Sequence, residues 1–90
     1  MICMLEIFIT PTFTRLYKKL PAVVQRRAEM KTELFRKNPF HTSLRAKKLE
    51  PHHEQVWSFW INKDYRIKFR FIDAKNVHFL YVGNRKDIYR

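Results

Sequence analysis

The chain has 90 residues, 46% of them hydrophobic and 16% aromatic, which is enough for one small domain with its own core and excludes two domains or a disordered chain. Its 19 lysines and arginines outnumber its 8 acidic residues, and the formal net charge of +11 favours a polyanionic partner such as nucleic acid. The single cysteine, Cys3, excludes an internal disulfide and a cysteine-based zinc site and fits a reducing cytoplasm, and no apolar run is long enough for a membrane span, so we expect no membrane partner.

The first half of the chain predicts one strand and two helices. Residues 5–10 form a short apolar segment with β-branched members, which is typical of a strand. Thr10 before Pro11 indicates a helix start, because threonine caps a helix and proline suits its first position. Pro21 ends this helix and opens another, which ends at Asn38 before the next proline. Both segments carry apolar stripes at helical spacing, so we expect a helical hairpin.

The second half predicts a charged loop and then three strands. Residues 40–55 lack periodicity and are interpreted as the loop, whereas residues 56–62, 65–71 and 77–82 are the expected strands. The short polar segments between these strands predict hairpin turns. We therefore expect a single α+β domain over residues 1–90, in the order β-α-α-β-β-β, with the helical hairpin packed on a small antiparallel sheet.

The strand over residues 65–71 alternates apolar and cationic residues. Successive side chains of a strand point to opposite faces, so the helices should cover one set, Tyr65, Ile67, Phe69 and Phe71. The opposite face should carry three cations at a spacing of about 7 Å, namely Arg66, Lys68 and Arg70. Such a row is either a solvated strand face or a surface that binds polyphosphate.

Trp60 falls on the same cationic side, because Trp57, Phe59 and Ile61 alternate toward the core. An exposed tryptophan offers a platform on which a nucleobase stacks. The alternative is that Trp60 covers part of the core or a partner helix. Arg85 and Lys86 follow the last strand at Gly83, where a loop would bring them beside this face.

Three short motifs occur together in this order. A Lys48-Leu49 pair precedes the three strands, Tyr65-Arg66 opens the middle one, and Val82-Gly83-Asn84-Arg85 precedes a tail with Tyr89. In these motifs, and over nearly its whole length, the chain resembles the RelE/ParE superfamily of small basic toxins. The resemblance implies a RelE-like toxin of a type II toxin–antitoxin pair, an mRNA interferase that cuts mRNA at the ribosome without a metal or other cofactor. It also implies an acidic antitoxin protein as partner, which the charge of +11 would complement.

The resemblance also implies roles for particular residues. Arg66 takes the place of the family's middle-strand active-site arginine, Arg85 that of a second arginine, and Tyr89 that of the tail tyrosine. One departure concerns the strand before the turn, where RelE itself carries lysines and this chain has Ser58 and Trp60.

The chemistry of RNA cleavage requires three kinds of group. A base must deprotonate the 2′-hydroxyl, cations must stabilise the charge of the phosphorane, and an acid must protonate the leaving 5′-oxygen. Arg66 and Arg85 suit the second task, and Tyr89 suits the third or stacks on a base. The general base stays open among four loop residues, Glu50, His52, His53 and Glu54. The expected RNA-binding residues are Lys47, Lys48, Trp60, Lys68, Arg70 and Lys86.

Two other functions fit the same sequence. A ParE-like toxin would inhibit DNA gyrase without cutting RNA, and a non-catalytic RNA-binding module would use the charge and Trp60 alone. The set of Arg66, Arg85 and Tyr89 argues against the gyrase inhibitor, and the missing lysines argue for it. The adjacent histidines normally point apart and lack further ligands at suitable spacing, so we expect no metal site. The oligomeric state stays open.

Overall fold

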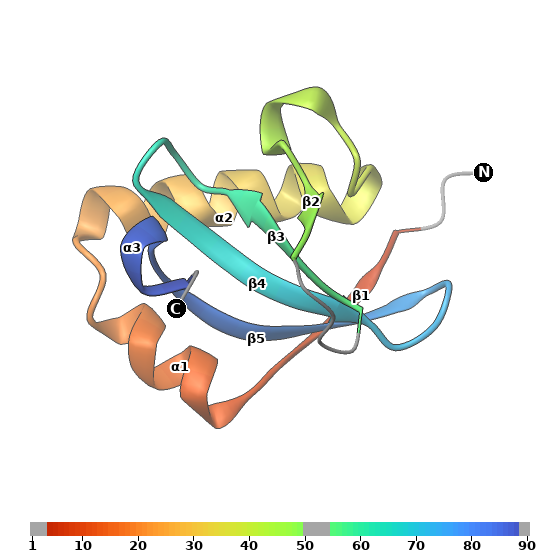
Figure 1. Ribbon diagram of the computed structural model, residues 1–90, viewed down its shortest axis with the longest axis horizontal. Helices are drawn as coiled ribbons and strands as arrows, with labels where there is room; N and C mark the ends of the chain where they lie inside the picture. Colours follow the sequence, from red (N-terminus) through yellow and green to blue (C-terminus); the bar gives the residue numbers. More distant parts are fainter. Residues whose placement is uncertain (1–3, 50–54, 89–90) are drawn as a thin grey trace.

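The computed structural model describes residues 4–49 and 55–88, and Figure 1 shows their arrangement. A helical hairpin lies along one face of a twisted sheet, and a short helix follows the last strand. The elements are β1 (Glu6–Ile9), α1 (Pro11–Lys18), α2 (Ala22–Lys37), the 3-10 helix η1 (Thr42–Leu44), β2 (Lys47–Lys48), β3 (Val56–Trp60), β4 (Tyr65–Phe71), β5 (Asn76–Asn84) and α3 (Arg85–Ile88).

The sheet has five strands in the order β1-β5-β4-β3-β2. β3, β4 and β5 form the expected antiparallel meander, and the α+β class is confirmed. β1 instead pairs in parallel with β5, from Glu6 opposite Asn76 to Ile9 opposite Phe79. This pairing places the first strand beside the last one, and the connection between them passes through the helical hairpin and then through β2, β3 and β4.

The expectation of one loop over residues 40–55 is wrong for its described part. Residues 42–44 form η1, and Lys47 and Lys48 form β2 by pairing with Ser58 and Trp57 of β3. A strand of two residues has no hydrophobic periodicity, so only its pairing with β3 creates it. The backbone N–H of Leu49 also donates to the Val56 carbonyl at 2.8 Å, so the residue after β2 lies beside the first residue of β3.

The start of α1 confirms the predicted cap. The Thr10 hydroxyl oxygen accepts the backbone N–H of Phe13 at 2.9 Å, which satisfies one of the unpaired donors of the first turn. The same hydroxyl donates to the Leu80 carbonyl at 3.1 Å. One side chain therefore begins the helix and ties it to β5.

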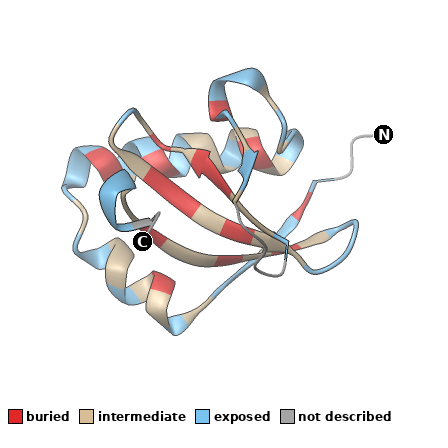
Figure 2. Cartoon of the chain, viewed as in Figure 1, coloured by how far each residue is buried: buried red, intermediate tan, exposed pale blue. Residues whose placement is uncertain are grey.

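The hydrophobic core lies between the helical hairpin and the inner face of the sheet. Phe35 of α2 is fully buried, and its ring centroid lies 4.9, 4.8 and 5.5 Å from those of Phe59, Phe69 and Phe79. Figure 2 shows the buried residues along the central strands and the inner side of the helices. Ile67 is buried with them, as the alternation of β4 predicted. Tyr65 and Phe71, at the two ends of β4, are only half-buried against the rim of this core.

A reciprocal set of hydrogen bonds locks α1 to α2. The Tyr17 hydroxyl donates to the Gln25 carbonyl at 3.1 Å, and Gln25 Nε2 donates to the carbonyls of Tyr17 at 2.9 Å and Leu20 at 3.2 Å. Burial, and after it the negative charge of Glu29, raise the pKa of Tyr17. The phenol therefore keeps the proton that it donates to α2.

Replacing Gln25 by alanine is expected to lower the free energy of unfolding by about 1 kcal/mol, because the Leu20 carbonyl loses its donor and the Tyr17 carbonyl keeps the Leu20 N–H. Equilibrium unfolding in urea measures the change. Arg26→Ala is the matched control, since Arg26 is the next residue of α2 and its side chain is exposed. Equal unfolding midpoints for the two variants would contradict the lock.

Candidate functional site

The pairing of the strands gathers the cations of β4 with side chains of three other strands. Directly opposed residues of an antiparallel pair project from the same face of the sheet. One row contains Trp60, Arg66 and Gly83, the next contains Lys47, Ser58, Lys68 and Tyr81, and the third contains Val56, Arg70 and His78. These rows lie on the sheet face opposite the helices, and we call them the cationic face.

Arg66 is the most enclosed cation of the cationic face, with 3% of its surface exposed. Its Nη1 donates to the carbonyl oxygens of Asn62 at 2.7 Å and Tyr65 at 3.2 Å. The guanidinium carbon lies 4.0 Å from the centroid of the Trp60 ring. Our expectation that Arg66 faces solvent is therefore wrong, because Trp60, its cross-strand neighbour, covers it.

One N–H group of the Arg66 guanidinium has no acceptor among the described residues. This group is Arg66 Nε, which is buried. A buried N–H without an acceptor costs about 1–3 kcal/mol relative to a satisfied one. An anionic oxygen that reached this nitrogen would remove that cost.

Trp60 contacts a second arginine, which the sequence did not single out. Arg45 follows η1 with left-handed backbone angles (φ 49°, ψ 46°), and its guanidinium carbon lies 4.3 Å from the Trp60 ring centroid. Both contacts are within the range of cation–π attraction. The structure thus places Trp60 against two guanidinium groups instead of leaving it free as a base platform. Arg45 lies in a segment without periodicity, so no sequence signal pointed to it.

Tyr81 is a residue of the cationic face that the sequence interpretation missed. The Lys68 ammonium lies 5.3 Å from the centroid of its ring. A Cβ at Gly83 would lie 3.2 Å from Tyr81 Cε1 and 3.8 Å from its hydroxyl oxygen. Because Gly83 pairs with Arg66, the phenol extends along β5 toward the row of Arg66, and the glycine leaves room for it. The pattern Val-Gly-x-Arg therefore has a packing reason here.

Arg85 and Lys86 are exposed at the start of α3. The expected loop after Gly83 is wrong, since β5 continues to Asn84 and α3 begins at once. The backbone N–H of Arg85 donates to the Asp64 carbonyl at 2.8 Å. This bond holds the start of α3 beside the β3–β4 turn, next to the end of β4 that carries Arg66.

The remaining candidates divide between the two faces and the undescribed segments. Lys47 lies on the cationic face, whereas Lys48 pairs with Trp57 and so points to the helix side. Arg70 is half-buried in the row with Val56 and His78. Tyr89 and the four candidate bases lie outside the described residues, namely Glu50, His52, His53 and Glu54.

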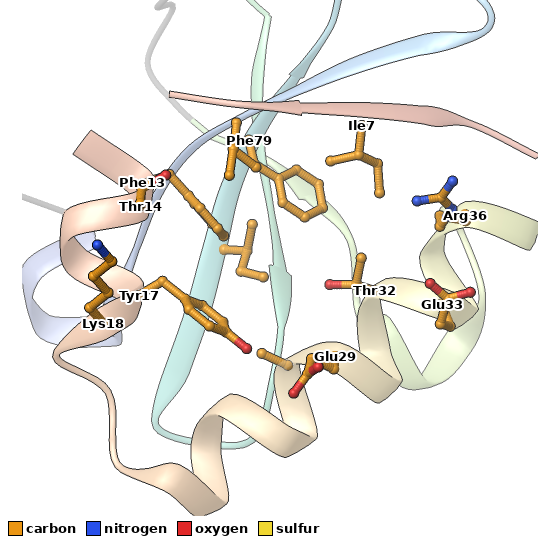
Figure 3. A pocket seen from close by; sticks show the side chains of 13 residues that line it. Ile7, Phe13, Thr14, Tyr17, Lys18, Glu29, Thr32, Glu33, Arg36 and Phe79 are labelled. Carbon is orange, nitrogen blue, oxygen red and sulfur yellow. The ribbon is translucent and has the colours of Figure 1, made fainter. Parts of the chain in front are cut away.

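An apolar cavity lies on the helix side, away from the cationic face. It has a volume of about 490 Å³ and is lined by α1, α2 and the inner face of the sheet. Figure 3 shows Phe13 and Tyr17 of α1 opposite Glu29 and Thr32 of α2, with Phe79 between them. None of the candidate catalytic or RNA-binding residues within residues 4–49 and 55–88 lines it.

Two further searches of the described residues bear on the function. Within residues 4–49 and 55–88, no three histidine, cysteine, aspartate or glutamate side chains gather as a group that could hold a metal ion. In the same part of the chain, no helix has the length and apolar character needed to cross a membrane.

No protein-family model and no curated protein matches this sequence. The fold nevertheless matches that of RelE-like toxins in solved structures. One is a chain of the archaeal RelE–RelB complex from Pyrococcus horikoshii OT3, with a TM-score of 0.74, 18% identity, and coverage of 91% of this chain and 96% of that chain.

Two other toxins extend this similarity. The toxin–antitoxin complex RelBE2 from Mycobacterium tuberculosis matches with a TM-score of 0.75 and 21% identity over 91% of this chain and 99% of that chain. The YoeB/ParE toxin from Agrobacterium tumefaciens matches with a TM-score of 0.76 and 13% identity over 90% and 99%. The chain therefore has the RelE-like toxin fold, which confirms the fold that its motifs implied.

Proposed function

We propose that this protein is the toxin of a type II toxin–antitoxin pair and that it cleaves mRNA on the ribosome. The observation that carries the proposal is the cationic face, where Arg66 and Lys68 of β4 meet Lys47 of β2 on a sheet surface that the helical hairpin leaves uncovered. The RelE-like fold supports it. A concentration of positive charge on one face attracts a phosphodiester chain.

In the proposed reaction the 2′-hydroxyl of the RNA attacks the adjacent phosphorus. Its proton passes to a base from the segment that holds Glu50, His52, His53 and Glu54, and the P–O5′ bond breaks as the leaving oxygen takes a proton from Tyr89. Arg66 and Arg85 stabilise the extra negative charge of the phosphorane between these steps. The product is a 2′,3′-cyclic phosphate, because the attacking oxygen belongs to the RNA. Tyr81 adds a phenol to the row of Arg66.

Arg66 must be uncovered before it can serve this reaction. Its terminal nitrogen is bonded to two carbonyls, and the Trp60 ring lies over the guanidinium. A phosphate that displaced Trp60 would supply the acceptor that Arg66 Nε lacks. The gain from this hydrogen bond would partly offset the lost contact between Trp60 and Arg66.

Incubating the purified protein with ribosomes stalled on a defined mRNA tests the proposal. We expect new 5′ ends within the ribosome-bound codon and upstream fragments that end in a cyclic phosphate. Mapping the 5′ ends and identifying the 3′-terminal chemistry measures both. Fragments with a plain 3′-hydroxyl would contradict attack by the 2′-oxygen, and intact mRNA would contradict the nuclease.

A ParE-like gyrase inhibitor is the second candidate. Where RelE itself carries lysines on this strand, β3 has Ser58, which is buried, and Trp60, which covers Arg66. β3 therefore has no lysine to handle the proton and charge of RNA cleavage. A DNA supercoiling assay with purified gyrase separates the two functions. Inhibition of supercoiling by a protein that leaves ribosome-bound mRNA intact would favour this candidate.

We further propose an acidic antitoxin as the partner of this protein. The net charge of +11 favours such a partner through electrostatic complementarity. The similar structures from Pyrococcus horikoshii and Mycobacterium tuberculosis are complexes of this kind, RelE with RelB and RelBE2.

A further inference from the structure

A positively charged hollow lies at the end of β3, where it adjoins the cationic face at Trp60. It has a volume of about 790 Å³ and lies between α2, η1 and the β3–β4 turn. This volume is within the range of cavities that hold ligands in proteins. We call it the basic cleft.

The basic cleft is lined by four cations from three separate parts of the chain: Arg27 and Lys31 of α2, Arg45 after η1, and Lys63 of the β3–β4 turn. One acidic residue, Asp64, also lines it, so four positive charges and one negative charge leave a formal charge of +3. Like charges around one concave surface repel each other, and the concave shape concentrates their field. Such an arrangement favours an anion with several charges.

The cleft has fixed walls as well as charge. Arg27 Nε donates to the Ile61 carbonyl at 3.3 Å, which attaches this side chain of α2 to the end of β3. On the opposite wall, Arg45 is held by its left-handed backbone and by its contact with the Trp60 ring at 4.3 Å. Two of the four guanidinium and ammonium groups are thus positioned before a ligand arrives, which lowers the entropy cost of binding.

Trp60 connects the basic cleft to the candidate active site. Its ring contributes to the wall of the cleft and also contacts the Arg66 guanidinium at 4.0 Å. A chain of phosphates with one member at Arg66 would pass Trp60 and reach Arg45 next. Because Trp60 is packed against both guanidinium groups, it holds two cations beside each other where successive phosphates of a strand would meet them.

We propose that the basic cleft binds the sugar–phosphate backbone of single-stranded RNA, at nucleotides next to the phosphate that reaches Arg66. The inference rests on the proposed function for the identity of the polymer as RNA. The occupant is RNA, because the cations of the cleft continue past Trp60 to Arg66, where the proposed reaction needs a phosphate. The wall of the cleft also contains Val23 and Ile61, so an acidic peptide is the alternative occupant that the experiment includes.

Fluorescence anisotropy with uncleavable 2′-O-methyl oligonucleotides tests the proposal. The probes are a dinucleotide and a strand of about ten nucleotides, a length that extends beyond one phosphate site. The test variant combines Lys31→Gln and Lys63→Gln. We expect it to bind the longer strand about tenfold more weakly at low salt, with a salt slope reduced by about 1.4 units for two lost cations. Its affinity for the dinucleotide should not change.

The matched control combines Lys37→Gln and Lys75→Gln, two exposed lysines that do not line the cleft. It has the same net charge as the test variant, so it separates position from total charge, and it should bind the longer strand more tightly than the test variant. Circular dichroism checks folding, and Lys63→Gln alone, at an exposed turn residue, replaces the double variant if that variant unfolds.

Three results would overturn the proposal: equal RNA affinity of test and control variants, a wild type that binds both probes equally, or a test variant that loses affinity for a polyglutamate peptide but not for RNA. The last result would assign the cleft to an acidic protein. A failure of the nuclease is distinguishable from these, because the uncleavable probes report binding alone. If RNA binding depends on the cleft but the protein cuts no mRNA, the result contradicts the proposed reaction and supports the proposed role of the cleft.

Discussion

Replacing Arg66 by lysine is expected to slow RNA cleavage by about a hundredfold or more while the domain stays folded. Lysine keeps the positive charge but loses the planar pair of donors that grips two phosphate oxygens at once. Its ammonium can still donate to a carbonyl at the β3–β4 turn, where Arg66 now bonds Asn62 and Tyr65. Single-turnover cleavage of ribosome-bound mRNA measures the rate.

Lysine is a sharper test here than alanine. Arg66→Ala would leave the Asn62 carbonyl without its donor and a hollow beneath Trp60, while the Tyr65 carbonyl keeps the Ile61 N–H. We expect this variant to lose about 1–3 kcal/mol of stability. Lost activity would then not report on catalysis alone. Arg15→Lys is the control, since Arg15 is exposed on α1 and lies on the helix side of the sheet. If folded Arg66→Lys cuts as fast as the control, Arg66 does not stabilise the phosphorane.

Arg85→Ala is expected to lower the cleavage rate by a similar factor, about a hundredfold, with almost no change in stability. The side chain is exposed, and the bond that holds this position, from the backbone N–H to the Asp64 carbonyl at 2.8 Å, survives in alanine. The rate with ribosome-bound mRNA and the urea midpoint together measure both parts of this expectation.

Lys86→Ala provides the comparison for Arg85. Lys86 is the next residue, is equally exposed and has the same charge, so its loss should raise KM and leave the rate of the bound complex near that of the wild type. A loss of rate in Arg85→Ala no larger than that in Lys86→Ala would show that Arg85 contributes only general electrostatic attraction.

Local patterns were sufficient for most of the fold. The strand β4 occupies the predicted residues 65–71, because strict alternation of apolar and cationic side chains is compatible only with an extended backbone that buries one face. The start of α1 was equally predictable from Thr10 and Pro11, since a helix cap depends on residues within one turn. The two-residue strand β2 and the parallel pairing of β1 with β5 were not, since both exist only through partners distant in the sequence.

The candidate site likewise contains residues that the sequence predicted and residues that only the structure revealed. Its motifs named Arg66 and Arg85, and the alternation placed Lys68 on the correct face. The roles of Arg45 and Tyr81 depend instead on contacts across the sheet, with Trp60 for the one and with Lys68 and Gly83 for the other. No local pattern reports such contacts, because they join residues of different strands.

The sequence by itself determined the class of this protein: a basic α+β domain whose middle strand presents cations on the face away from its helices. That outcome follows from charge and periodicity, which are properties of neighbouring residues. Only the tertiary structure decided which of those cations are buried and which are exposed. Because β3 pairs with β4 so that Trp60 lies opposite Arg66, the arginine that the motif marks as catalytic is buried beneath an indole ring, and Arg45 closes over that ring from a loop.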